Sequence, residues 1–313
     1  MQNINDKIRG MVVGSVTGDA LGMPLEFHAP RELNNLAREM EMGPLPAGTF
    51  TDDTEMALAL AESLLEHSPL DGEDFTQRLL AWVQNRPADI GIHTSKVLSL
   101  IANGISWREA SERVQSEDPQ NAGNGSLMRT WPVAAIHHNN PGLLIAESRL
   151  QSQITHAHAD CVNACVFLDL VLADLIHRDS RKTPNAALRE VITSSLTRIS
   201  LGKDFELLIK LAAVRQRDAL PNSGWVRHTL ESALWAVLTT QTFEDALISA
   251  VNLGNDADTA GAVTGAIAGA LYGYEAIPAR WKAVIHGEYP LRSGRIWFLQ
   301  DFLNLADEMA EEG

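Results

Sequence analysis

Two segments of the chain place a glycine at every fourth position, first at Gly10, Gly14, Gly18 and Gly22, and again at Gly261, Gly265, Gly269 and Gly273. Residues four apart share one face of an α-helix, and each glycine inside a helix costs about 1 kcal/mol relative to alanine. Close approach of two helix backbones compensates for such a row. The pattern therefore predicts two helices deep in the core that pack against one another. The alternative is that one or both segments are loops, with the first breaking near Gly18.

Apolar residues elsewhere recur with helical spacing. The run TEMALALAESLLEH places Met56, Leu60 and Leu64 on one face. Similar runs cover residues 74–85, 161–177, 184–199, 225–240 and 243–254, and no series of alternating, strand-like runs stands between them. None of the connecting segments is long enough to be a domain linker. We predict an all-α fold, a compact single-domain bundle of at least about a dozen helices over residues 1–313.

The composition narrows the class of protein. Hydrophobic residues make up 45% of the chain, enough for a sizeable core, and 25 Lys and Arg against 40 Asp and Glu give a formal net charge of −15. So acidic a chain is a poor candidate for non-specific binding to nucleic acid or anionic membranes. Cys161 and Cys165 lie one helical turn apart and are expected to be buried thiols in a reducing compartment. The first residues lack a signal-peptide layout, and the uncharged run 259–274 is too short to span a membrane, so we expect a cytoplasmic protein. We also expect a monomer.

Two acidic clusters stand where loops enter helices. The first lies in TDDT and comprises Thr51, Asp52, Asp53 and Thr54; the second lies in NDADT and comprises Asp256, Asp258 and Thr259. Asp and Thr commonly cap helix N-termini, so capping is the alternative for each cluster taken alone. However, the cations nearest to the second cluster lie more than twenty positions away, and buried carboxylates are costly unless paired or bound to metal. If the clusters meet, their oxygen ligands suit two Mg²⁺, Mn²⁺ or Ca²⁺ ions about 3.5–4 Å apart.

Further polar groups could serve a ligand, and each has an ordinary structural alternative. Glu26 follows Pro24 at a predicted helix exit, where it either faces a cavity or is solvated. Asp89 lies in a tight loop before a helix, where an N-cap is the alternative. A turn at a predicted helix start offers backbone amides that can cradle a phosphate, from Gly123, Asn124, Gly125 and Ser126. In THAHADC, His156 or His158 could hydrogen-bond a ligand, although a histidine satisfied within the fold is the default; on a helix the two would diverge, which argues against a joint metal site.

Six segments occur together and in this order: GSVTGDALGMPLEF, TDDTEMALAL, PADIG, GNGSLMR, THAHADCVNA and NLGNDADTAGAVTGAIAGALYG. In them the chain resembles the ADP-ribosylglycohydrolase family, whose founding member is the dinitrogenase-reductase-activating glycohydrolase. The resemblance covers nearly the whole chain. It implies an all-α fold with a binuclear Mg²⁺ or Mn²⁺ centre at the bottom of a cleft. By motif, the metal ligands would be Thr51, Asp52 and Asp53 on one side and Asp256, Asp258 and Thr259 on the other.

The resemblance also implies roles for the other candidates. Glu26, Asp53 and Asp89 would act in catalysis. The turn from Gly123 to Ser126 would bind ADP-ribose together with a histidine, and the choice between His156 and His158 stays open. The reaction would be hydrolysis of the N-glycosidic bond between ADP-ribose and an acceptor, most often the arginine of a modified protein.

Four alternatives to that reaction remain. Some members of the family act on serine-linked ADP-ribose or on small adducts. A different two-metal hydrolase would act on phosphoesters or nucleotides. A non-catalytic ADP-ribose-binding or immunity protein would work by occlusion, and a purely structural helical protein would bind no metal. The two intact acidic clusters argue against a degenerate, structural member of the family.

Overall fold

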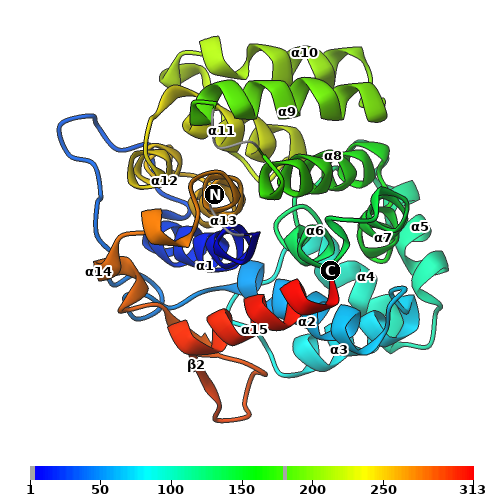
Figure 1. The fold of residues 1–313 in the computed structure, drawn as a ribbon. Coiled ribbons are helices and arrows are strands. Elements are labelled where there is room, and N and C mark those ends of the chain that lie inside the picture. The colour runs from blue at the N-terminus through cyan, green and yellow to red at the C-terminus, as the bar shows by residue number, and fades with distance from the viewer. Residues whose placement is uncertain (1–3, 179–181) are drawn as a thin grey trace.

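The computed structural model describes residues 4–178 and 182–313. The two glycine-rich segments form α1 (Ile4–Gly22) and α13 (Ala257–Tyr272), which lie side by side at the centre of the molecule (Figure 1). Glycines of one row face glycines of the other, in the pairs Gly10–Gly269, Gly14–Gly265 and Gly18–Gly261. Because residue numbers rise along one helix as they fall along the other, the two helices are antiparallel.

Only glycine permits this approach. A Cβ atom added at any of the six paired positions would lie closer than 3.0 Å to backbone atoms of the facing helix. The predicted pairing is confirmed, and α1 continues through Gly18 without the break that we considered. Gly273 lies just beyond the last residue of α13, where it ends that helix in the left-handed region at φ +86°.

The described residues contain fifteen α-helices. Besides α1 and α13 these are α2 (Asp52–Glu66), α3 (Gly72–Gln84), α4 (Ile92–Ala102), α5 (Trp107–Glu117), α6 (Trp131–His137), α7 (Pro141–Gln153), α8 (Ala159–Ile176), α9 (Pro184–Arg198), α10 (Lys203–Leu211), α11 (Val226–Thr239), α12 (Phe243–Val251), α14 (Ala279–Lys282) and α15 (Leu299–Glu312). Short 3₁₀ helices cover Met23–Leu25, Ala212–Val214, Arg217–Ala219 and Tyr274–Ala276.

The other helices surround the central pair. α11 and α12 pack against α13, α15 packs against α1, and α8 packs against α6, α7 and α9. In Figure 1, α9 and α10 form the layer on one side of the molecule, and α2, α3 and α15 lie on the opposite side. One large cluster of buried apolar side chains runs through these layers. The fold is therefore the compact, single-domain, all-α bundle that the helical periodicity predicts.

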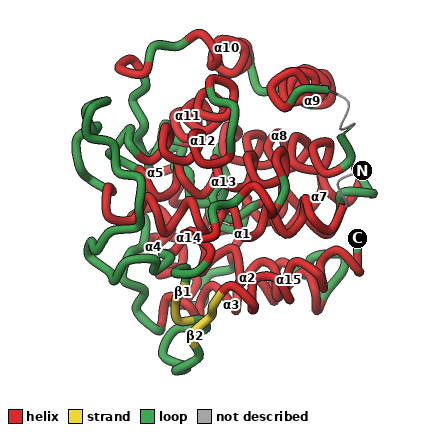
Figure 2. The backbone as a smooth tube through the Cα atoms, turned by 60° about the vertical axis from the view of Figure 1, so that its left-hand side comes forward, coloured by secondary structure: helices red, strands yellow, loops and turns green. Residues whose placement is uncertain are grey.

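The structure also contains a small sheet that we did not predict from the sequence. Strands β1 (His286–Glu288) and β2 (Ile296–Phe298) pair antiparallel, with His286 opposite Phe298 (Figure 2). On its other side, β1 bonds to the segment before α2, because the His286 N–H donates to the Gly48 carbonyl and the Phe50 N–H donates to the His286 carbonyl, at 2.9 and 3.1 Å. The sheet thereby fixes the chain immediately before TDDT.

Two further expectations concern buried segments. Cys161 and Cys165 are free, buried thiols, as predicted. Among the described residues, no helix combines the length and the apolar character needed to cross a membrane.

Candidate active site

The antiparallel pairing of α1 and α13 brings acidic residues from opposite ends of the chain together. The last turn of α1 lies beside the first turn of α13, because Gly22 contacts the backbone of Ala257 and Asp258. Glu26, which follows α1 and the 3₁₀ turn after it, therefore lies near the start of α13. One carboxylate oxygen each from Glu26, Asp256 and Asp258 lies within 4.8 Å of the other two.

The TDDT segment forms the N-terminus of α2, but capping does not account for its side chains. Thr51 occupies the N-cap position without a hydrogen bond from its side chain to the helix. Instead, the Thr51 hydroxyl donates to Asp19 Oδ1 at 2.9 Å and the Thr54 hydroxyl donates to Asp19 Oδ2 at 2.5 Å. The backbone N–H groups of Thr51 and Thr54 donate to the same carboxylate. Asp19, on α1, thus orients the entry to α2.

The two acidic clusters meet. Thr259 donates from Oγ1 to Asp53 Oδ2 at 3.4 Å, across a sequence separation of 206 residues. The other oxygen of that carboxylate, Asp53 Oδ1, is buried and has no hydrogen-bond partner among the described residues. At the start of α13, Asp256 is the N-cap residue, yet its side chain makes no capping bond either. Capping alone is therefore the wrong interpretation of both clusters.

The electrostatics of the cluster are unfavourable for ionised carboxylates. Burial, together with the charges of neighbouring carboxylates, raises the pKa of Asp52, Asp53 and Asp258 well above the usual range. Burial, and then the charges of Asp89 and Asp256, raise the pKa of Glu26 to about 8. Among the described residues, none of these side chains forms an ion pair with Lys, Arg or His.

The donor set fits divalent cations. It consists of carboxylate and hydroxyl oxygens, which hard ions such as Mg²⁺ and Mn²⁺ prefer. An unpartnered buried oxygen on Asp53 and mutual repulsion among close carboxylates are the features that bound cations would compensate. Asp19 completes the arrangement, because the Thr51 hydroxyl gives its proton to Asp19 and keeps its oxygen lone pairs for another partner.

The turn 123–126 adjoins the acidic cluster, although our prediction that it begins a helix is wrong. The residues after it form turns, and α6 begins at Trp131, where Pro132 favours a helix start. A helix dipole therefore does not contribute at this turn. Asn124 instead connects it to the cluster: Nδ2 donates to Asp256 Oδ2 at 2.6 Å and to Thr229 Oγ1 at 2.8 Å.

The two candidate histidines have different surroundings. Neither lies within a helix, because His158 is the N-cap residue of α8 and His156 precedes it in the loop. His158 accepts a hydrogen bond at Nδ1 from the N–H of Asp160, as a capping residue does. His156 is buried, and its ring faces Gly123 and Gly125 of the turn. The geometry therefore favours His156 as the histidine of the site.

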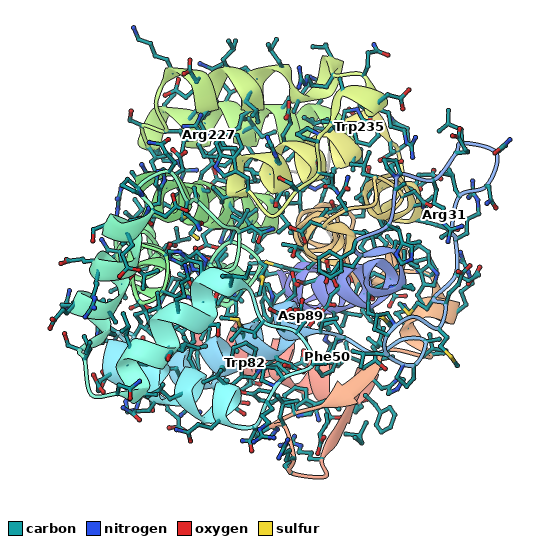
Figure 3. The ribbon with its side chains drawn as sticks, turned by 180° about the vertical axis from the view of Figure 1, so that it is seen from behind. Arg31, Phe50, Trp82, Asp89, Arg227 and Trp235 are labelled. Carbon is teal, nitrogen blue, oxygen red and sulfur yellow. The ribbon has the colours of Figure 1, made fainter. Side chains whose placement is uncertain are left out.

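Asp89 lies in the loop between α3 and α4 and is half-buried. The N-cap of α4 is Gly91, so the capping alternative for Asp89 is wrong. Its Oδ1 accepts a hydrogen bond from the Ile90 N–H at 2.8 Å. The charge of Asp89 is among the causes that raise the pKa of both Glu26 and Asp52, so Asp89 lies at this site. It is labelled near the middle of the view in Figure 3.

Some residues of the site were not selected from the sequence. Asp19 is one of them, although an Asp next to Gly18, in a helix predicted to lie deep in the core, was a usable signal. Glu55, directly after TDDT, is buried and accepts a hydrogen bond from Trp82 Nε1 at 2.6 Å, and burial raises its pKa to about 7. No sequence signal pointed to Trp82, which lies on the neighbouring helix α3 (Figure 3).

Comparisons with known proteins identify the family of the chain. The family model described as ADP-ribosylglycohydrolase matches residues 1–313. The ADP-ribosylarginine hydrolase Tri1 of Serratia proteamaculans (strain 568) is 36% identical over 286 residues, which cover 88% of this chain and 74% of the relative. The ADP-ribosyl-[dinitrogen reductase] glycohydrolase of Rhodospirillum rubrum is 30% identical over 286 residues, which cover 89% of this chain and 90% of the relative.

The fold agrees as well. A solved structure described as an ADP-ribosylglycohydrolase-related protein complex matches with a TM-score of 0.79 and 31% sequence identity, over 100% of this chain and 99% of that chain. The chain therefore belongs to the ADP-ribosylglycohydrolase family of glycosidic-bond hydrolases.

Proposed function

We propose that this protein hydrolyses the N-glycosidic bond between ADP-ribose and the arginine side chain of a modified protein, and so reverses mono-ADP-ribosylation. The observation that carries the proposal is the meeting of Asp53 and Thr259 in an acidic cluster where, among the described residues, neither Asp53 nor its acidic neighbours pair with a protein cation. Arginine is favoured as the acceptor by the name of the Serratia relative, an ADP-ribosylarginine hydrolase.

The cluster would hold two divalent cations, Mg²⁺ or Mn²⁺. Their ligands would be Thr51, Asp52 and Asp53 at the start of α2 and Asp256, Asp258 and Thr259 at the start of α13. When bound, such ions act as Lewis acids that polarise ribose hydroxyls and water. Asp53 would serve both as a metal ligand and in catalysis, since its buried Oδ1 has no hydrogen-bond partner among the described residues and is available to an ion.

The protein's own carboxylates would transfer the protons of the reaction. In the reaction, a bond forms between a water oxygen and the anomeric carbon of the ribose, and the bond from that carbon to the guanidine nitrogen breaks, with its electron pair leaving on nitrogen. Water must lose a proton and the departing guanidine must gain one. The charge of Asp89 helps to raise the pKa of Glu26, so the two carboxyl groups lie near one another, and this pair is suited to accept the first proton and supply the second.

The turn 123–126 would bind the diphosphate of ADP-ribose through the backbone amides of Gly123, Gly125 and Ser126, assisted by His156. The N–H of Asn124 does not take part, because it donates to the Gly224 carbonyl at 3.0 Å. Asn124 fixes the position of this turn relative to Asp256. The distal ribose and the diphosphate would therefore be held by two adjoining parts of one site, which orients the scissile bond for attack.

The test is release of ADP-ribose from arginine-, serine- and DNA-linked substrates, with and without Mg²⁺. We expect Mg²⁺-dependent release from arginine, and a loss of about a hundredfold or more in kcat/KM for Asp52→Ala and for Asp258→Ala. Asp218→Ala is the matched control, because the Asp218 side chain is 93% exposed. Wild-type rates in both site variants would refute the assignment of the cluster.

The same assay separates the alternatives. Release from serine-linked ADP-ribose alone would identify a different acceptor for the same site. Binding of ADP-ribose without release from any substrate would indicate a non-catalytic binding protein.

A further inference from the structure

A buried polar network lies beneath the turn 123–126 and outside the acidic cluster. It joins the turn to the segment before α8 through three side chains. Gln151 donates from Nε2 to the carbonyl of Ser126 at 3.1 Å, and the hydroxyls of Ser126 and Ser152 are 2.9 Å apart. The backbone N–H of His156 donates to the Ser152 carbonyl at 2.7 Å, and the Ser152 hydroxyl donates to the His156 carbonyl at 3.1 Å. The backbone of His156 is thus fixed relative to the turn.

At the centre of this network is a buried cation. Arg129 is fully buried, and among the described residues no carboxylate pairs with it. Its Nε and Nη2 donate to Gln151, and Nη2 also donates to Thr155 Oγ1 at 2.9 Å. Burial lowers the pKa of Arg129 to about 10, so the guanidinium still carries its charge at neutral pH.

The hydrogen bonds of Thr155 determine which way its hydroxyl proton points. Arg129 can only donate, so Thr155 Oγ1 is the acceptor in that bond. The second hydrogen bond of Oγ1 among the described residues is to His156 Nδ1, at 2.8 Å. Oγ1 still has a proton to donate, and Nδ1 is its remaining partner among the described residues. Both groups are satisfied when Nδ1 carries no proton and accepts from the hydroxyl, and we assign that direction.

The ring of His156 is consequently neutral with its proton on Nε2. Burial, the neighbouring His93 and Arg129 lower the pKa of His156 well below the usual range, which agrees with a neutral ring. The ring of His93 lies against it, tilted by 34° with ring centroids 4.8 Å apart, and His93 itself donates from Nε2 to the Thr155 carbonyl at 3.0 Å.

The Nε2 edge of His156 faces the turn. A Cβ atom built on Gly125 would lie 3.3 Å from Nε2, and one built on Gly123 would lie 3.5 Å from it. Because neither position carries a Cβ atom, the backbone of the turn can lie directly beside this edge of the ring. A donor beside backbone amides suits an anionic oxygen, as in a phosphate.

We propose that Thr155, oriented by Arg129, is a positioning residue that fixes His156 in the Nε2–H tautomer, so that His156 donates a hydrogen bond to the diphosphate of the substrate. The identity of this ligand rests on the proposed function, whereas the tautomer does not. Thr155 itself touches neither the ligand nor the reacting atoms.

The first experiment is ¹⁵N NMR of the histidine side chains in the full-length protein without ligand, with His156 assigned by its loss in His156→Gln. We expect wild type and Thr155→Ser to carry the proton on Nε2. In Thr155→Val the hydroxyl is missing, and we expect a mixture of tautomers or a proton on Nδ1. A proton on Nδ1 in wild type, or an unchanged Nε2–H tautomer in Thr155→Val, would overturn the proposal.

The second experiment measures ADP-ribose affinity by titration calorimetry, and KM and kcat on the arginine-linked substrate. We expect Thr155→Val to weaken ADP-ribose binding about tenfold and to raise KM with little change in kcat, since one ligand hydrogen bond is weakened. Thr155→Ser should stay within about twofold of wild type.

The matched control is Thr264→Val, because the Thr264 hydroxyl is buried and has no hydrogen-bond partner among the described residues. Equal losses of affinity in Thr155→Val and Thr264→Val would show a general packing effect and overturn the proposal. If wild type binds no ADP-ribose, the proposed function fails, while the NMR result still decides the role of Thr155.

Discussion

Individual carboxylates in the site have different surroundings, and these assign them different tasks. Asp52, Asp53 and Asp258 are buried among other acids. Asp89 is half-buried on a loop, and Asp19 is fully buried but saturated with hydrogen bonds from Thr51 and Thr54. We therefore expect the first three to bind cations, Asp89 to act in proton transfer and Asp19 to orient the ligands.

Replacing Asp89 should affect the chemical step alone. For Asp89→Asn we expect kcat to fall by about 10²–10⁴, the usual contribution of a general acid or base, because the amide cannot exchange the proton. Mg²⁺ affinity measured by calorimetry should stay at the wild-type value. A variant that loses Mg²⁺ binding as well would make Asp89 a ligand instead.

Replacing Asp19 should affect metal binding first. In Asp19→Asn an NH₂ group replaces one carboxylate oxygen, so it cannot accept all the hydrogen bonds that Thr51 and Thr54 donate. We expect Mg²⁺ affinity to fall about 10–100-fold, as is usual for residues that orient metal ligands. Calorimetry on this variant and on the exposed control Asp218→Asn makes the comparison; equal affinities would remove Asp19 from the site.

Glu26 should make the metal-free protein less stable as the pH rises. The folded protein raises the pKa of Glu26 from 4.5 to about 8, so it holds a proton that the unfolded chain has lost in that window. The contribution of protonated Glu26 to the free energy of unfolding is fully present below about pH 4.5 and is lost as the pH rises through 8.

Metal-free Glu26→Gln should therefore melt at the same temperature as wild type near the low end of this window and at a higher temperature near the high end. Differential scanning calorimetry in the presence of a chelator measures this, with the exposed Glu32→Gln as control. A melting difference that does not grow with pH would contradict the assignment.

At the scale of elements, the pairing of α1 with α13 builds both the core and the site. For Gly18→Ala we expect a loss of about 1–3 kcal/mol in the free energy of unfolding, because the added Cβ would meet the backbone of Gly261. This outweighs the gain of about 1 kcal/mol in helix propensity.

Gly142→Ala is the control for that substitution. Gly142 lies in the first turn of α7, where the nearest atom to an added Cβ is 3.5 Å away, so alanine there should be neutral or stabilising. Urea unfolding of both variants compares them. A stable Gly18→Ala protein would mean that the two helices separate readily.

The sequence predicted the elements with a strong local period and missed those without one. The glycine rows and the apolar runs identify helices because their spacing repeats over several turns. Strands β1 and β2 have three residues each, too few for an alternating pattern. The turn 123–126 looked like a helix start because Gly and Asn precede an apolar run, but Pro132 delays the helix to Trp131.

The site was predictable in its ligand types but not in its supporting residues. The segments TDDT and NDADT are recognisable in the sequence because oxygen-bearing side chains follow one another closely. Thr155 and Arg129 carry no such pattern, because their roles depend on tertiary contacts between the turn 123–126 and the segment before α8.

For the whole molecule, the fold brings four separate parts of the chain to one place: the end of α1, the start of α2, the turn 123–126 and the start of α13. Buried carboxylates meet there, and among the described residues Asp52, Asp53 and Asp258 pair with no Lys, Arg or His, so we expect metal ions at this place. One other group of possible ligands, Glu66, His67 and Asp74 on the surface, offers a competing location.

The most direct test is an anomalous difference map from crystals soaked in Mn²⁺. If two metal ions bind there, we expect two peaks between the start of α2 and the start of α13, in contact with the carboxylates of Asp52, Asp53, Asp256 and Asp258. An empty cluster in such a map, or Mn²⁺ bound solely by Glu66, His67 and Asp74, would contradict that expectation.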